Sequence, residues 1–394
     1  MENGARGGRP KFEGRTSKSE VRRAVIQHPA STMSSILGCS LDDLDTPALV
    51  LDLTVLDRNL EKMASFFRGR ACQLRPHFKN HKCTRLARRQ LDAGAAVGMT
   101  CAKLGEAEVL VDAGFDDILI ANQVVGSRKM ARLVAIADRA AVCVAVDHPS
   151  HLESISQAGQ AAGVTIGVLV EVDIGMHRCG VPPGEPALDL ARLAADLPGI
   201  RFDGLQAFEG HLPYVEDRAE RRKQTATSMQ LALDTRRLIE DSGLPVAVVS
   251  GGSSSTYDIT GALDGVDELQ AGTYATMDCA YRRRVPEFEI AMTIAARVIS
   301  RPQPDVAVLD VGIKGGAHEF GVPEVKDYPQ STVPFFMSEE HCLVHNVPDW
   351  PIGQVVELIS SHACTTCNLY REFHVVDQGK VVDVWPIEAA GKLA

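Results

Sequence analysis

Residues 142–173 read VCVAVDHPSHLESISQAGQAAGVTIGVLVEVD and hold one complete repeat of the pattern that decides the fold. Two apolar, β-branched runs, 142–147 and 167–173, flank a stretch with helical spacing, which is typical of β/α units that build a parallel sheet. The pattern recurs along the chain, and the eight candidate strands are 72–79, 97–102, 117–121, 142–147, 167–173, 204–210, 246–250 and 268–274. Because an open doubly wound sheet usually stops at five or six strands, eight units predict a closed (β/α)8 barrel of the α/β class.

The segments on either side of the repeats predict a second domain. An extra strand, 48–53, precedes the repeats, and after Met277 the runs are separated by Gly and Pro turns with little helix between them. These later candidate strands are 290–300, 306–311, 355–360, 372–376 and 380–385. We therefore expect a barrel over 54–278 and an antiparallel β domain made from 41–53 and 279–394, with a hairpin at 377–380.

Composition limits the partners. The 394 residues include 41 Lys and Arg against 51 Asp and Glu, a formal charge of −10, which excludes nucleic acid as the main partner. No apolar run approaches the roughly 18 residues of a membrane helix, so no membrane association is expected. The ten cysteines lack the dense spacing of a secreted disulfide scaffold, which predicts a reducing, cytoplasmic location.

Residues 1–40 differ from the rest, with seven Lys or Arg against three Glu, a local charge of +4. We interpret them as a flexible basic arm. No apolar stretch follows the basic residues, which argues against a signal peptide, while an organellar transit peptide stays open as the alternative.

Barrels of this class carry their active sites at the carboxyl ends of the strands. The first predicted strand ends in Arg75-Pro76-His77-Phe78-Lys79-Asn80-His81-Lys82. A lone lysine there is most often a solvated loop residue. An amine held near His and Arg can instead have a lowered pKa and form a Schiff base.

Small residues follow the seventh and eighth predicted strands, as Ser250-Gly251-Gly252-Ser253-Ser254-Ser255-Thr256 and Gly272-Thr273-Tyr274. Barrels commonly bind a phosphate at this place through backbone N–H groups. One such run is usually a flexible loop, but two after neighbouring strands, together with a lysine across the mouth, suggest pyridoxal 5'-phosphate. Polar side chains also close strands five and six, among them Arg178, Gln206, Glu209 and His211.

A second group of candidates lies in the β domain. His362 and Cys364 stand two residues apart at a predicted strand end, and both are good ligands for a divalent ion. Two protein ligands leave positions for water and substrate, as a catalytic metal requires. A His-x-Cys pair also occurs by chance, and Cys364-x-x-Cys367 could alternatively be a redox-active cysteine pair. Glu339-Glu340-His341 is a further candidate, with a surface acidic turn as the alternative.

Taken together, these motifs make the chain resemble the D-threonine aldolase family of fold-type III pyridoxal phosphate enzymes, which includes D-3-hydroxyaspartate aldolases and D-serine dehydratase-like proteins. The resemblance runs from Asp45 to the C-terminus. The motifs that carry it are Asp45-Thr46-Pro47-Ala48, Arg75-Pro76-His77-x-Lys79-x-His81-Lys82, Arg178-Cys179-Gly180, Ser250-Gly251-Gly252, Ala271-Gly272-Thr273-Tyr274, Glu339-Glu340-His341 and His362-x-Cys364. It implies an alanine-racemase-like barrel with a β domain and a homodimer whose sites lie near the partner chain.

The resemblance also assigns roles to residues. Lys79 matches the Schiff-base lysine, with His77 beside it as a further catalytic candidate. The cofactor-binding candidates are Arg178, Gln206, Ser250, Gly252, Ser254, Gly272, Thr273 and Tyr281, and the metal candidates are His362 and Cys364 for Mg, Mn or Zn. The chain departs from the family pattern at Ala102, where related aldolases can have a Gln that contacts the cofactor, and at Cys364, which is Asp in many aldolases and Cys in the dehydratase-like branch.

The expected reaction is retro-aldol cleavage of a D-3-hydroxy amino acid to glycine and an aldehyde, with the metal lowering the pKa of the β-hydroxyl. The base is left open among a metal-bound water, Glu209, His211 and His341. The main alternative is a dehydratase that forms a 2-oxo acid and ammonia, which Cys364 favours; a non-catalytic cofactor carrier and a racemase are weaker alternatives. Arg282-Arg283-Arg284 is interpreted as a solvated charge run, with attraction of a carboxylate substrate as the alternative.

Overall fold

The structure is a computed structural model that describes residues 36–335 and 338–394. Of the expected basic arm only residues 36–40 lie in these ranges, and Gly38 and Cys39 exchange backbone hydrogen bonds with Val381. Within the described residues, no helix is long and apolar enough to cross a membrane.

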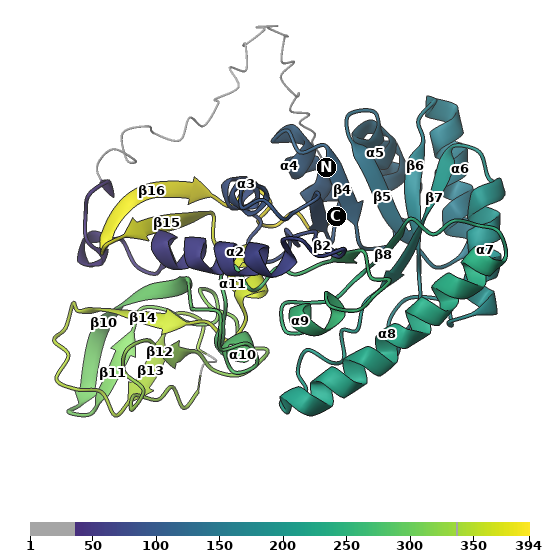
Figure 1. The fold of residues 1–394 in the computed structure, drawn as a ribbon. Coiled ribbons are helices and arrows are strands. Elements are labelled where there is room, and N and C mark those ends of the chain that lie inside the picture. Colours follow the sequence, from purple (N-terminus) through teal and green to yellow (C-terminus); the bar gives the residue numbers. More distant parts are fainter. Residues whose placement is uncertain (1–35, 336–337) are drawn as a thin grey trace, which may run out of the picture. The chain divides into compact units, whose positions relative to one another are not determined.

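Eight parallel strands form the first sheet, in the spatial order β2-β9-β8-β7-β6-β5-β4-β3 (Figure 1). Their bounds are β2 Gln73–Leu74, β3 Met99–Cys101, β4 Asp117–Ile120, β5 Ala141–Val146, β6 Ile166–Glu171, β7 Ile200–Ala207, β8 Val248–Gly251 and β9 Glu268–Leu269. The two ends of the sheet meet through parallel bridges that join Leu74 to Ala96 and His77 to Thr100. The predicted barrel is confirmed, with one strand in each of the eight predicted ranges.

Helices follow the strands as the amphipathic spacing predicts. They are α2 Leu53–Phe67, α3 Thr84–Asp92, α4 Leu104–Asp112, α5 Ser127–Ala137, α6 Pro149–Ala162, α7 Glu185–Asp196, α8 Arg218–Asp241 and α9 Tyr257–Thr260. Local sequence sets their ends: Asp217 accepts a hydrogen bond from the Glu220 N–H at the start of α8, and α6 begins at Pro149 and ends at Gly163 with φ +70°. Their buried faces pack on the strands and form the core with them.

The second sheet is mostly antiparallel, with the order β12-β14-β10-β1-β15-β16 and a branch in which β11 pairs with β10 and β13. Its strands are β1 Ala48–Asp52, β10 Met292–Gln303, β11 Val306–Leu309, β12 Glu324–Val325, β13 Cys342–His345, β14 Val355–Ile359, β15 Glu372–Asp377 and β16 Lys380–Pro386. Two short helices, α10 Cys279–Arg282 and α11 Ala363–Leu369, lie beside it, and the 3-10 turn η1 Leu41–Asp43 precedes β1. The predicted hairpin forms at Gln378 and Gly379, both at positive φ.

The prediction for this domain was wrong in two details. One pair, β1 with β15, is parallel, and the strands β12 and β13 were not predicted. β12 has only two residues, and β13 alternates buried and solvent-facing side chains without a long apolar run, so neither stands out from the turns around it.

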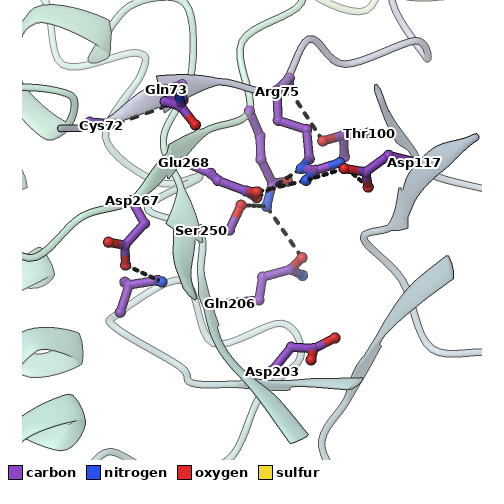
Figure 2. A network of polar contacts seen from close by, with 12 residues as sticks. Cys72, Gln73, Arg75, Thr100, Asp117, Asp203, Gln206, Ser250, Asp267 and Glu268 are labelled. Carbon is purple, nitrogen blue, oxygen red and sulfur yellow. Dashed lines mark hydrogen bonds and ion pairs between the residues drawn. The ribbon is translucent and has the colours of Figure 1, made fainter. Parts of the chain in front are cut away.

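Arg75 holds the amino-terminal end of the barrel together (Figure 2). Its guanidinium makes bidentate hydrogen bonds to Glu268 at 2.7 and 2.8 Å and to Asp117 at 2.8 and 3.3 Å. Gly98 lets it pass, because a Cβ there would lie 2.3 Å from the Arg75 Nη1. The Arg75 side chain therefore links β2 to β9 and β4 at the place where isolated bridges join β2 and β3. Its guanidinium points away from the strand ends that carry Lys79.

Replacing Arg75 by Ala should lower the free energy of unfolding by about 3–5 kcal/mol, because Glu268 would stay buried without its counter-charge. Urea denaturation of the purified protein measures this. The control is Arg58→Ala, which breaks a pair with Glu289 whose side chains are both about half exposed and should cost less than about 1 kcal/mol. Equal losses in the two variants would contradict the role assigned to Arg75.

Candidate active site

A pocket that is partly open to solvent lies at the carboxyl ends of the barrel strands, where Lys79, Arg178, Gln206 and Tyr281 meet. Ten of the residues singled out in the sequence line it: His77, Lys79, Arg178, Gln206, Gly252, Ser254, Gly272, Thr273, Tyr281 and Cys364. Tyr281 and Cys364 lie on α10 and α11 beside the second sheet, so both parts of the chain build the pocket. Converging polar groups at the carboxyl ends of barrel strands are typical of a site for a small-molecule ligand.

The Lys79 amine is held without a carboxylate. None of the ion pairs between described residues includes it, and its Nζ lies 5.7 Å from the centre of the Phe208 ring. Burial lowers the pKa of Lys79, and the nearby Arg178 charge acts in the same direction. A larger fraction of the amine is therefore neutral near pH 7 than for a solvated lysine, and a neutral amine can attack an aldehyde.

His77 lies directly beside this lysine. It is buried, and its Nδ1 accepts a hydrogen bond of 3.5 Å from the backbone N–H of Lys79. Burial, with the charges of Lys79 and Lys82, holds the pKa of His77 well below its usual range. The ring is therefore neutral and shapes the turn that presents the lysine.

The two glycine-containing loops form one wall. Gly252 has φ +81°, and a Cβ at Gly272 would lie 2.7 Å from the His77 carbonyl oxygen, so both positions need glycine. The loops are joined because the Ser254 Oγ accepts a hydrogen bond of 2.9 Å from the Tyr274 N–H. Within the described residues, no hydrogen bond uses the backbone N–H groups of Ser254, Gly272 and Thr273, which leaves three donors for an anion.

Five candidates do not line the pocket: Ser250, Glu209, His211, His341 and His362. The Ser250 Oγ accepts a hydrogen bond of 2.9 Å from the Nε2 of Gln270, which does line the pocket. Glu209 is fully buried behind the loop that begins at Gly252, and His211 packs against Gly175. His341 is exposed immediately before β13. The structure therefore does not bring the three expected general bases, Glu209, His211 and His341, to the pocket.

Gln206 and Arg178 contribute two further polar side chains to the lining of the pocket. The Gln206 Oε1 is 3.4 Å from the Gln270 Nε2, and the Arg178 guanidinium lies 5.5 Å from the centre of the Phe208 ring. Within the described residues, Arg178 has no ion-pair partner, so its positive charge is available to a ligand.

His362 and Cys364 form a linked pair at the other side of the pocket. The His362 Nδ1 lies 2.6 Å from the Glu319 Oε1, and the Cys364 Sγ accepts a hydrogen bond of 3.6 Å from the Asn80 Nδ2. Burial would raise the pKa of the Cys364 thiol, but its hydrogen bond with His362 and the charges of His362 and Lys79 lower it overall. Residues 36–335 and 338–394 contain no group of three or more His, Cys, Asp or Glu side chains arranged to hold a metal, so within them His362 and Cys364 stand as a pair.

Several residues of the site were missed in the sequence. Asp278 joins α10 to α11, because its carboxylate accepts hydrogen bonds from the N–H groups of Tyr281 at 2.8 Å and Ala363 at 3.0 Å. Asn80 lies inside the recognised motif around Lys79, and Gln270 directly precedes the motif that begins at Ala271, so their positions were the available signal. Nothing in the local sequence points to Glu319, 43 residues before His362.

The sequence matches known families over both parts of the chain. Residues 51–279 match the alanine racemase N-terminal domain, and residues 291–376 match a serine dehydratase domain. The chain is 38% identical to a D-threonine aldolase from Arthrobacter sp. (95% of this chain, 99% of the relative) and 33% identical to a 3-hydroxy-D-aspartate aldolase from Paracoccus denitrificans (90% and 94%).

A more distant relative has a different activity, since the D-threo-3-hydroxyaspartate dehydratase from Delftia sp. is 29% identical (87% and 97%). Among solved structures, D-threonine aldolase from Filomicrobium marinum superposes with a TM-score of 0.88 at 39% identity, covering 91% of this chain and 99% of that one. The chain is therefore a lyase that belongs to the alanine racemase-like D-threonine aldolase family.

Proposed function

We propose that the protein is a lyase, dependent on pyridoxal phosphate and a divalent metal, that cleaves D-3-hydroxy amino acids to glycine and an aldehyde. The observation that carries the proposal is the meeting of three features in one pocket: the unpaired Lys79 amine, the free N–H groups of the glycine loops, and Cys364 of the His362 pair. The names of the relatives at 38% and 33% identity support the same reaction.

The pocket fits pyridoxal phosphate. The N–H groups of Ser254, Gly272 and Thr273 would bind its phosphate, and the Lys79 amine would bind its aldehyde. Arg178 and Gln206 line the same pocket and would contact the ring. Ser250 and Gly252, also expected to bind the cofactor, contribute differently, since Ser250 supports Gln270 and Gly252 shapes the loop.

The His362 and Cys364 pair fits a divalent metal. A thiol and an imidazole favour zinc among Mg, Mn and Zn, and a carboxylate on the second nitrogen of a ligating histidine is the usual way to fix that ring. Glu319 takes this place on His362. Two protein ligands leave room for water and substrate.

When bound, the cofactor would supply an electron sink and the metal a Lewis acid that favours loss of the β-hydroxyl proton. The chain's own residues orient the reactants. Arg178 presents a positive charge at the rim, and Tyr281, whose backbone Asp278 fixes, closes the side next to Cys364. Of the side chains expected to transfer protons, His77 and Lys79 line the pocket, and burial lowers the pKa of Lys79, so that its Nζ releases a proton more readily than a solvated lysine does.

Product analysis tests the reaction. The purified protein with pyridoxal phosphate and a divalent metal should convert D-threonine to glycine and acetaldehyde, measured by chromatography and by an aldehyde-coupled assay. Incubation with D-serine gives the comparison. Formation of a 2-oxo acid and ammonia without glycine would contradict the aldolase and establish the dehydratase.

The dehydratase stays as the second candidate because of Cys364 and of the Delftia relative. In that reaction the same metal site would make the β-hydroxyl a leaving group. The Cα–H bond would be broken, and the Cα–Cβ bond would stay intact. A non-catalytic carrier would need Lys79 and the glycine loops but not His362 and Cys364. The homodimer and the cytoplasmic location stay predictions, which sedimentation and cell fractionation would check.

Replacing Glu319 by Gln should weaken metal binding by about 10-fold or more, because His362 would lose the charged partner that orients its ring. Competition with a chromophoric chelator measures the affinity. Glu324→Gln is the matched control, since Glu324 pairs with Arg282 and Arg283, and its metal affinity should equal that of the parent. Parental affinity in Glu319→Gln would remove Glu319 from the metal site.

A further inference from the structure

Glu209 holds the glycine loop after β8 from behind. The side chain is fully buried, and its two carboxylate oxygens accept three hydrogen bonds. The Gly252 N–H donates to Oε2 at 3.0 Å, and the hydroxyls of Thr256 and Thr260 each donate to Oε1 at 2.7 Å. Within the described residues, no ion pair includes Glu209, so these neutral donors alone stabilise the carboxylate.

The same contacts determine which N–H groups of the loop are left free. The Gly252 N–H donates to Glu209 itself. The Ser253 N–H donates to the hydroxyl oxygen of Thr256 at 3.0 Å, and that hydroxyl in turn donates its proton to Glu209. The N–H groups of Ser255 and Thr256 are taken by Ser253. Ser254 is therefore the one residue from 252 to 256 whose N–H has no partner among the described residues, and it lines the pocket.

We propose that Glu209 is a positioning residue that fixes this loop so that the Ser254 N–H faces the phosphate of the cofactor. The proposal rests on the proposed function and replaces the general-base role expected from the sequence. Glu209 acts through the loop and touches neither the cofactor nor the substrate.

A Gln at this position separates this role from simple packing. One oxygen would become an amide NH₂, and because both threonine hydroxyls donate to the same oxygen, the NH₂ would face the Gly252 N–H, donor against donor. The loop would then lose the bond that fixes Gly252. Within the part of the chain that the structure describes, no hydrogen bond or ion pair joins Glu209 to Lys79, so the Lys79 side of the pocket should keep its shape.

The experiment compares two aldehydes on the full chain freed of cofactor: pyridoxal phosphate, and pyridoxal, which has no phosphate. Absorbance titration gives a Kd for each. In Glu209→Gln the Kd for pyridoxal phosphate should rise about 10-fold or more, and the Kd for pyridoxal should stay within about twofold of the parent. Glu388→Gln is the matched control, because Glu388 is a partly buried carboxylate that accepts hydrogen bonds from the N–H group and the hydroxyl of Thr84. Neither residue lines the pocket, so this variant should leave the ratio of the two constants unchanged.

Equal effects on the two aldehydes, or no effect on either, would overturn the role of Glu209. If Glu209→Gln does not fold, Thr260→Val carries the test, since it removes one donor at nearly constant shape and should weaken pyridoxal phosphate alone by a few fold. A parent chain that binds neither aldehyde would contradict the proposed function, and this inference would fall with it.

Discussion

Lys79→Ala should lower the rate of D-threonine cleavage by a factor on the order of 10³ or more, because the variant has no amine at the position where the cofactor aldehyde would bind. The parent with pyridoxal phosphate should absorb at roughly 410 to 430 nm, and the variant should not. Borohydride treatment followed by mass spectrometry should find the cofactor on Lys79 in the parent.

Lys223→Ala is the control for this change. Lys223 is an exposed residue of α8, and its loss should leave both the rate and the absorbance unchanged. If Lys79→Ala kept its absorbance in this range, another lysine would carry the cofactor, and Lys82 would not be the first choice because Glu106 binds it as a buried ion pair.

Chelation should have the second large effect. Treatment with EDTA should reduce cleavage by a factor on the order of 10² or more while the absorbance at roughly 410 to 430 nm persists, and added divalent ions should restore activity. The two readouts should differ because Lys79 and the glycine loops would hold the cofactor, whereas His362 and Cys364 would hold the metal. Metal content by elemental analysis accompanies each step.

His362→Ala should reproduce the chelated state without a chelator, and added metal at the parent's working concentration should not restore it. His148→Ala is the control, since His148 is an exposed residue before α6. Full activity in EDTA, with no metal in the purified protein, would contradict the metal site and favour the carrier or a metal-independent lyase.

The barrel could be predicted because the hydrophobic pattern of each β/α unit is complete within about thirty residues. The hairpin at Gln378 and Gly379 could be predicted because its turn residues and strands are also adjacent in the sequence. Lys79 and the two glycine loops could be predicted because each lies in one short segment at a strand end. Glu209 could be recognised as a candidate for the same reason. Its contacts could not be predicted, because its partners Gly252 and Thr260 are 43 and 51 residues away in the sequence.

Asp278 and Glu319 show the same limit more strongly. Asp278 acts on Ala363, 85 residues away, and Glu319 acts on His362 from a loop with no strand or helix to place it. Contacts of this kind depend on how the second sheet packs on the barrel, and no spacing within the sequence encodes that arrangement.

The two origins of the pocket residues have a consequence for how such enzymes diversify. The barrel strands present Lys79 and the glycine loops, while α10 carries Tyr281 and α11 carries Cys364, with His362 immediately before it. On the proposed function, cofactor retention and the choice of bond to break would depend on separate parts of the chain. A chimera that keeps residues 54–278 and takes the segment around α11 from a dehydratase should inherit the donor's chemistry without having to rebuild the cofactor site.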